Sequence, residues 1–184
     1  MMISGVYSHT DVKLFESKTT FRPVSKNEIL LNKGEVCKSF FFSLTGAFYQ
    51  YKYTDEGEEN VLDLHVAHEW FLNQGSFISQ TPSDRFIKAY CEGNILELDI
   101  TSIHELIGES AAFLQLGKIL QQATAQAYFF DNRLTPTQKY QYILDNRAAL
   151  IQHFPLKWIA SYLKITPETM SRVRESFAKG KIIS

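Results

Sequence analysis

Polar residues near the C-terminal end of the chain have side-chain types suited to reading DNA. In the run from Thr166 to Glu175, TPETMSRVRE, polar residues surround two apolar residues placed three apart. Arginine forms bidentate hydrogen bonds with guanine edges, and short acids or hydroxyls meet the amino groups of cytosine and adenine. We predict that part of this run contacts bases and that nearby cations contact phosphates. The predicted DNA-binding residues are Thr166, Pro167, Glu168, Ser171, Arg172, Lys157, Lys164 and Arg174.

These residues need two helices that meet at a tight corner. Ile159, Tyr162 and Leu163 recur at helical spacing and predict the buried face of a first helix, with the small Ala160 at the crossing. Thr166 is a candidate N-cap, and Pro167 suits the first helical position. The pattern predicts a helix-turn-helix over residues 154–178, with two ordinary packed helices as the alternative.

The second helix and the corner add two expectations. Met170 and Val173 should face back onto the first helix, and Glu168 places a negative charge near the positive end of the helix dipole. Lys164 stands at the corner, where glycine is more usual, so we expect it in a mildly strained left-handed conformation.

Charge is distributed unevenly along the chain. Residues 151–184 carry six Lys or Arg and two acids, a net charge of +4, whereas the whole chain carries −1. The first 150 residues therefore carry −5. A basic end on a mildly acidic body favours a protein that contacts phosphate with that end only.

The composition limits the classes of protein. With 184 residues, 45% of them hydrophobic, the chain can bury one good core and a smaller second one. We find no candidate membrane span or secretory signal and expect a cytoplasmic protein that binds no membrane. Two cysteines, Cys37 and Cys91, are too few for a disulfide framework or an iron-sulfur cluster. A single axial histidine can suffice for haem, so the five histidines leave haem as the alternative, but a lone histidine is more often a surface or core residue. We therefore predict no metal and no cofactor.

Short aromatic and branched runs separated by turn residues lie between Glu28 and Ile100: ILLNKG, KSFFFSLTG, AFYQYKYTDEGEEN, VLDLHV, WFL and NILELDI. They predict strands of a sandwich or barrel. The stretch YKYTDEGEENVLDLHV predicts a hairpin whose turn is the charged DEGE run. Thr101 or Ser102 would cap the helical region that follows.

Small and apolar residues at helical spacing run from about Ser110 to Asn132 and predict one long helix. We interpret it as a dimer seam that includes Leu116, Leu120, Ala123 and Ala127, with packing on its own β domain as the alternative. Leu134, Thr135 and Pro136 then break the pattern and start a new capped helix. The predicted divisions are a β-rich domain at 1–109, a dimerisation helix at 110–133 and a helix-turn-helix domain at 134–184.

This order of elements resembles the CRP/FNR family of bacterial transcription regulators. The resemblance covers nearly the whole chain and is carried by Gly34 in LLNKGE, Gly46 in FSLTGAF and the run WIASYLKITPETMSRVRE. It implies an α+β fold with an N-terminal cyclic-nucleotide-binding-like β-roll (jelly roll), a long dimerisation helix and a C-terminal winged helix-turn-helix. The final KGKIIS predicts a short wing. By position, Pro167, Glu168 and Arg172 fall on the family's base-reading sites.

The family also implies partners and an effector pocket. The partners are a two-fold double-stranded DNA operator, a second copy of the chain, RNA polymerase and a small-molecule effector. Members that bind cyclic AMP use a Gly-Glu pair for the ribose and an Arg-Ser pair for the phosphate. Here Leu72 and Asn73 replace the first pair, and Ser83 and Asp84 replace the second, with Arg85 one or two positions late. Because a carboxylate repels phosphate, we predict no response to cyclic AMP.

The resulting prediction is a dimeric, sequence-specific DNA-binding transcription regulator. The alternative is a small-ligand- or partner-binding protein of the same fold that no longer reads DNA. An enzyme is the least favoured class, because the chain lacks a glycine-rich phosphate loop and a nucleophile elbow. Asp63, His65 and His68 lie close in sequence, but strand alternation would send neighbours to opposite faces.

Overall fold

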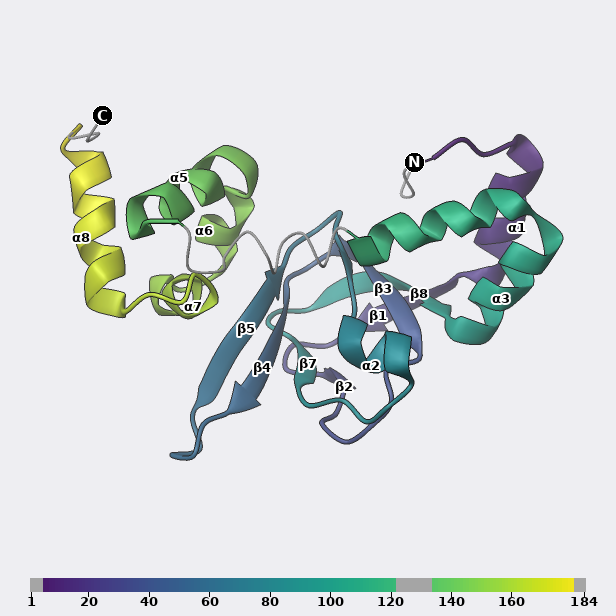
Figure 1. Cartoon of the computed structure of the whole chain (residues 1–184), viewed down its shortest axis with the longest axis horizontal. Coiled ribbons are helices and arrows are strands. Elements are labelled where there is room, and N and C mark those ends of the chain that lie inside the picture. The colour runs from purple at the N-terminus through teal and green to yellow at the C-terminus, as the bar shows by residue number, and fades with distance from the viewer. Residues whose placement is uncertain (1–4, 122–133, 181–184) are drawn as a thin grey trace.

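A β-roll forms the centre of the molecule, with helices at both ends (Figure 1). The computed structural model describes residues 5–121 and 134–180. Helices α1 (His9–Lys18) and α3 (Ile100–Glu109) lie together at one end of the roll. The C-terminal helices lie at the other end, in the order α5 (Pro136–Asn146), α6 (Ala149–His153), α7 (Leu156–Tyr162) and α8 (Pro167–Ala178). We call residues 134–180 the helical module.

The roll consists of two four-stranded sheets in which every pairing is antiparallel. The first has the order β1 (Thr20–Val24), β8 (Gly93–Asp99), β3 (Ser39–Thr45), β6 (Trp70–Phe71). The second has the order β2 (Ile29–Leu31), β7 (Phe86–Ala89), β4 (Phe48–Tyr53), β5 (Glu59–His65). Phe48, Phe71, Ile95 and Leu98 fill the space between them. The expected α+β class and antiparallel, jelly-roll-like core are confirmed.

Two glycines allow the chain to turn closely at one edge of the roll. Gly46 has a φ of 89°, and a Cβ there would lie 2.9 Å from the carbonyl oxygen of Glu92. A Cβ at Gly93 would lie 2.3 Å from the carbonyl oxygen of Thr45. Side chains at either position would force these backbones apart, which explains why glycine occupies position 46.

The predicted hairpin is present, and several elements were missed. β4 pairs with β5, and the turn between them is closed by a hydrogen bond from the amide of Thr54 to the carbonyl of Glu58 (2.8 Å). Strands β1 and β7 and helices α1 and α2 (Gln74–Ser79) were not predicted. β1 contains Pro23, which weakens a strand pattern.

The segment after the roll differs from the single long helix predicted from Ser110. The cap of α3 is Asp99, not Thr101 or Ser102, because its carboxylate accepts from both of their backbone amides (2.8 and 3.0 Å). Residues 111–116 form a 3-10 helix, and helical structure continues from 117 to 121. Phe113, Leu116 and Ile119 belong to the core of the roll. The segment up to residue 121 therefore packs on its own β domain.

Two of the four residues predicted to form the dimer seam pack on the roll, and the other two are not described. Leu116 is 2% exposed within its own roll core, so its side chain has no surface to offer a second subunit. Leu120 packs against the same core, and its carbonyl accepts from the side-chain amide of Gln74 (3.0 Å). Ala123 and Ala127 lie outside the described residues. No helix in the described residues is long and apolar enough to cross a membrane.

The helical module packs against the outer face of β4 and β5. Tyr49, Tyr51, Val61 and Leu64 from these strands share one hydrophobic cluster with buried residues of α5 to α8. Meanwhile Phe48, on the opposite face of β4, belongs to the core of the roll. β4 is thus covered on both faces, and the roll and the helical module share a continuous packed boundary.

Candidate nucleic-acid interface

Helices α7 and α8 meet at the tight corner that the sequence predicts. Ile159, Ala160 and Leu163 are fully buried, and Tyr162 is 5% exposed. Lys164 has a φ of 54°, so the expected left-handed conformation is confirmed. The amide of Ile165 donates to the carbonyl of Ala160 (3.0 Å) and closes the turn.

The start of α8 is fixed by a side-chain cap. The hydroxyl of Thr166 accepts from the backbone amide of Thr169 (3.2 Å), and Pro167 occupies the first turn. The pKa of Glu168 is lowered by hydrogen bonding to its own backbone amide and to Thr166, and by the charge of Arg172. Glu168 is therefore a carboxylate at neutral pH, able to accept from the amino groups of cytosine or adenine.

One face of α8 is buried and the other is open. Met170 and Val173 are 1% and 8% exposed and pack in the cluster shared with α7, as predicted. All eight residues predicted to contact DNA are exposed: Thr166, Pro167, Glu168, Ser171, Arg172, Lys157, Lys164 and Arg174. The backbone of α7 and α8 therefore presents this set to solvent while the apolar residues hold the pair together.

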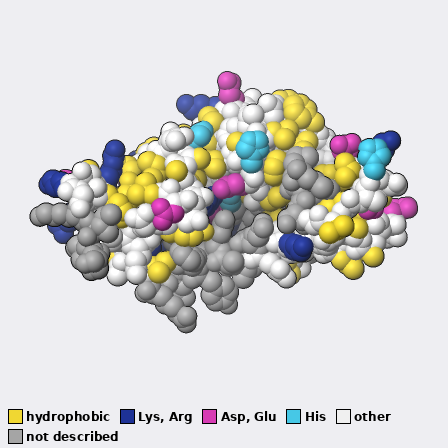
Figure 2. All heavy atoms as spheres, turned by 90° about the horizontal axis from the view of Figure 1, so that it is seen from above, with side chains coloured by type: hydrophobic (Ala, Val, Ile, Leu, Met, Phe, Trp, Pro, Cys, Tyr) yellow, Lys and Arg dark blue, Asp and Glu magenta, His cyan; other side chains and the backbone are white. Residues whose placement is uncertain are grey.

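Within the described part of the chain, the cations of this exposed set have no salt-bridge partner. Across residues 5–121 and 134–180, no carboxylate oxygen lies within 4 Å of the charged nitrogens of Lys157, Lys164, Arg172 or Arg174. Lys179, at the far end of α8, does pair with Glu175 (3.8 Å). Figure 2 shows Lys and Arg side chains gathered at the end of the molecule that the helical module forms. These charges are available to an anionic partner.

Sequence reasoning missed one lysine that supports the corner. Lys139 on α5 is 4% exposed, and its ammonium donates to the carbonyl of Leu163 at the end of α7 (2.9 Å). The last carbonyls of a helix lack intrahelical partners and favour a cation. No sequence pattern indicated this role, because a lysine within a helical pattern is ordinarily expected to face solvent.

The residues at the cyclic-nucleotide positions are engaged with one another. Leu72, Asn73 and Ser83 are buried. Asn73 caps α2 by accepting from the amide of Ser76 (3.4 Å), and its own amide donates to the hydroxyl of Ser83 (2.7 Å). The Ser83 hydroxyl in turn donates to the carbonyl of Arg85 (2.6 Å). These polar groups serve the loop rather than an open pocket.

The charged residues of the same loop neutralise each other. Asp84 accepts from Nε of Arg85 (2.8 Å) and pairs with Lys52 of β4 (2.5 Å). The hydrogen bond from Arg85 holds the pKa of Asp84 well below its usual range, with burial opposing this and Lys52 adding to it. Arg85, the arginine that this loop carries, is thus already bound to a carboxylate.

The structure offers no cluster suited to a metal among the residues that it describes. Cys37 is buried, and burial raises the pKa of its thiol, so it behaves as a core residue. Cys91 is half-buried elsewhere on the roll. Of the predicted wing KGKIIS, residues 181–184 lie outside the described residues.

Comparisons with known proteins agree with this architecture. Residues 21–127, more than half of the chain, match the family model "Cyclic nucleotide-binding domain". The "Fumarate and nitrate reduction regulatory protein" of Yersinia pestis is 23% identical over 180 residues, which cover 89% of this chain and 70% of that protein.

Solved structures show the same fold over most of the chain. FixK2 from Bradyrhizobium japonicum superposes with a TM-score of 0.69 at 16% identity, covering 90% of this chain and 87% of that one. The Catabolite Activator Protein of Thermus thermophilus gives a TM-score of 0.59 at 16% identity, covering 100% and 89%. The chain therefore belongs to the cyclic nucleotide-binding domain family, and its fold is similar to those of FixK2 and the Catabolite Activator Protein.

Proposed function

We propose that this protein is a dimeric, sequence-specific DNA-binding transcription regulator. The observation that carries the proposal is the exposed polar face at the leading end of α8, held by a buried apolar face on α7. In a helix-turn-helix, the N-terminal residues of the second helix enter the major groove while the first helix crosses the backbone. Glu168, Ser171 and Arg172 would read base edges, and Lys157, Lys164 and Arg174 would contact phosphates.

The dimer is part of this proposal. Two subunits that place their α8 helices about 34 Å apart would enter successive major grooves of a two-fold operator. The CRP/FNR resemblance favours pairing through the segment that contains Ala123 and Ala127. Leu116 would act indirectly, by fixing that segment on the roll core.

We also propose that the roll does not respond to cyclic AMP. The ribose and phosphate of that ligand need a carboxylate and a free arginine, and here Asn73 and the paired Arg85 occupy the corresponding loop. Placing a phosphate near Asp84 would add repulsion between like charges. A different effector of the roll is compatible with this arrangement.

The first experiment is selection of bound duplexes from a random pool, followed by fluorescence anisotropy with the enriched sequence. We expect a two-fold motif, affinity that falls steeply with salt, and no change on adding cyclic AMP. Failure to enrich any motif would favour the alternative of a ligand- or partner-binding protein. Tighter binding with cyclic AMP would contradict the inactive cassette without affecting the DNA-binding proposal.

A phosphate contact gives a more specific readout. Lys157→Ala should weaken binding about equally for all duplex sequences, because phosphates are the same in every sequence. It should also lower the slope of log affinity against log salt by about 1, since one fewer counterion is released on binding. A change confined to one sequence would assign Lys157 to base reading instead.

A further inference from the structure

Arg147 connects the roll to the helical module and lies apart from the exposed face of α8. It follows the last residue of α5 and is 7% exposed. Its guanidinium leaves the helical module and reaches the turn between β5 and β6. An arginine with so little solvent contact needs nearly all of its donors satisfied by protein groups.

Those donors reach partners on both sides of the boundary. On the roll, Nε and Nη2 donate to the two carboxylate oxygens of Glu69 (3.1 and 2.6 Å), and Nη2 also donates to the carbonyl of Leu64 (2.8 Å). On the helical module, Nη1 donates to the hydroxyl of Tyr162 (2.7 Å). The Glu69 carboxylate is itself held by the amide of Val66 (3.1 Å). The guanidinium is therefore fixed by a two-pronged ion pair on one side and by α7 on the other.

The electrostatics show that the guanidinium stays charged. Burial acts to lower the pKa of Arg147, but the surroundings, including Tyr162, Glu69 and Asp63, raise it above its ordinary value. Tyr162 is deeply buried, and burial raises the pKa of its phenol, so it stays protonated. Arg147 therefore meets Glu69 as a cation.

A largely buried ion pair of this kind specifies geometry more than it stabilises. The Arg147 side chain is 5% exposed and that of Glu69 is 26% exposed, so the cost of removing these charges from water offsets much of their attraction. What the arginine fork adds is orientation, because its two parallel hydrogen bonds accept only one approach of the carboxylate. Tyr162 is the last residue of α7, immediately before the corner that leads to α8.

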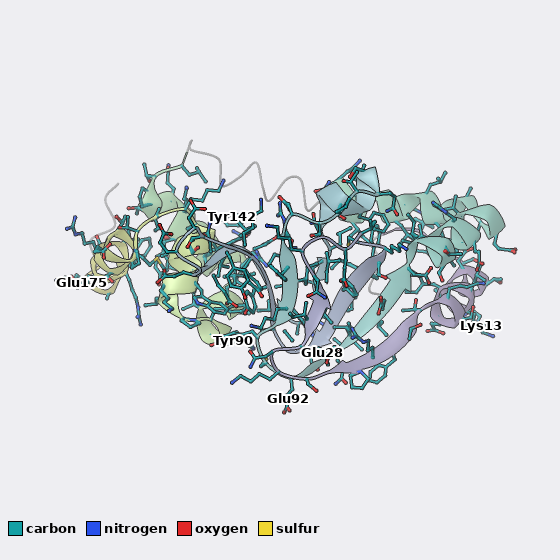
Figure 3. All side chains as sticks on the ribbon, turned by 90° about the horizontal axis from the view of Figure 1, so that it is seen from below. Lys13, Glu28, Tyr90, Glu92, Tyr142 and Glu175 are labelled. Carbon is teal, nitrogen blue, oxygen red and sulfur yellow. The ribbon has the colours of Figure 1, made fainter. Side chains whose placement is uncertain are left out.

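A second set of contacts aligns the rest of α7. The hydroxyl of Ser161 lies 3.1 Å from Oδ1 of Asn60 and donates to the carbonyl of Val61 on β5 (3.0 Å). Trp158 packs with its ring centre 4.5 Å from that of Tyr49 and 5.1 Å from that of Tyr90. Figure 3 shows Tyr90 at the boundary of the roll with the helical module, and Glu175 at the outer end on α8. The roll therefore holds α7 along its length while α8 stays open.

We propose that Arg147 is a positioning residue for operator reading: it locks α7 onto the roll so that each subunit presents α8 in one orientation. The inference rests on the proposed function. In a dimer, a fixed orientation of both α8 helices lets the second half-site bind without a further ordering cost. A single half-site makes no such demand, because one subunit can turn as a whole to meet it.

The test uses the full chain in a Trp70→Phe background. Since the chain has two tryptophans, Trp158 then becomes the only one, and its emission reports docking of α7. The variants are Arg147→Met, which keeps the aliphatic stem, and Arg147→Lys, which keeps the charge but loses the fork. Arg22→Met is the matched control, because Arg22 pairs with Glu28 (2.6 Å) inside the roll.

We expect both Arg147 variants to lose at least tenfold in affinity for the selected two-half-site duplex. Binding to a duplex with one half-site should change less than twofold, and Trp158 emission should shift to longer wavelength. Arg22→Met should match the background in all three readouts. If Arg147→Met does not fold, Arg147→Lys alone decides, because it retains a cation in the buried site.

Three results would overturn the positioning role. Equal losses on both duplexes would indicate a general structural effect, unchanged affinity on both would show that orientation is not limiting, and tighter two-site binding would show that docking opposes DNA reading. Absence of duplex binding by the unaltered protein would instead remove the proposed function itself. In that case a Trp158 shift in the Arg147 variants would leave the residue as an interdomain clamp only.

Discussion

The leading face of α8 and the loop between β6 and β7 both carry an arginine beside an acid, yet they offer different chemistry. Arg172 and Glu168 lie one helical turn apart on an exposed face, and no carboxylate oxygen lies within salt-bridge distance of Arg172 in the described chain. Arg85 and Asp84 are adjacent and hydrogen-bonded, with Lys52 completing the group. An arginine and an acid close in sequence therefore indicate a candidate binding site only where the fold leaves their charges unpaired.

The largest expected effect is on the open face. Arg172→Ala should lower affinity for the selected two-fold duplex by at least roughly 30-fold, because it removes one bidentate base contact from each of the two half-sites, at about 1–3 kcal/mol each. It should also relax sequence preference at one position of each half-site. The measurement is anisotropy titration, with Lys179→Ala at the other end of α8 as the control. Unchanged affinity in Arg172→Ala would support the partner-binding alternative.

The loop between β6 and β7 should respond in stability instead. Asn73→Ala removes the cap of α2 and the hydrogen bond to Ser83, so we expect a loss of about 2 kcal/mol in the free energy of unfolding. Denaturant unfolding measures it, with the exposed Ser79→Ala of the same helix as the control. If Asn73→Ala left the free energy of unfolding unchanged, Asn73 would not have a structural role, and the proposed contrast between this loop and α8 would be wrong.

Removing the N-cap of α8 should have a smaller effect, on stability. Thr166→Ala should cost about 1 kcal/mol of stability, because the amide of Thr169 loses its acceptor. Thr166→Ser keeps a hydroxyl and should retain most of that energy. Thermal unfolding of the three proteins checks the ranking. If Thr166→Ser were as unstable as Thr166→Ala, the methyl group rather than the cap would be responsible.

The smallest effect concerns the paired charges of the loop. Asp84→Asn should cost less than about 1 kcal/mol at pH 7, because the Asp84 side chain is 53% exposed and solvent screens its two ion pairs. Since the folded protein lowers the pKa of Asp84, its contribution is present above the unfolded value of about 3.9 and is lost as the pH falls below it. The gap between Asp84→Asn and the unaltered protein should therefore close in acid.

Urea unfolding at a series of pH values measures this gap. Asp145→Asn is the control, since Asp145 is an exposed carboxylate that accepts a hydrogen bond from the side-chain amide of Gln141 (2.7 Å). A gap that widened toward low pH would contradict the assigned direction of the Asp84 pKa.

Local patterns predicted the parts of the fold that depend on neighbours in sequence. Helical spacing identified the buried faces of α7 and α8, and the hydroxyl of Thr166 and the ring of Pro167 marked the helix start. The left-handed conformation of Lys164 was also predicted, because it depends only on that residue and its turn. The helix expected from Ser110 was wrong in its first turns, because packing of Phe113 and Leu116 into the roll favours a 3-10 helix there.

The boundary between the roll and the helical module was missed, although β4 carried a signal. In FYQYKY, aromatic residues occupy both faces of the strand, and a strand that is apolar on both faces must be covered on both. Such a pattern indicates that something covers the outer face but not what does so. Arg147 gave no signal, because a lone arginine after a helix reads as a solvated cap.

Local sequence patterns were enough to predict the α+β class, the helix pair at the C-terminal end and its exposed polar face, because each follows from periodicity, capping or residue type within one segment. The mismatch of the cyclic-nucleotide cassette came from the family resemblance instead. Three features required the folded molecule: Asp84 and Arg85 neutralise each other with Lys52, Leu116 is a core residue, and Arg147 joins α7 to the roll. These outcomes depend on which distant residues meet, and the free energy of such contacts is set by burial and geometry that a linear pattern does not contain.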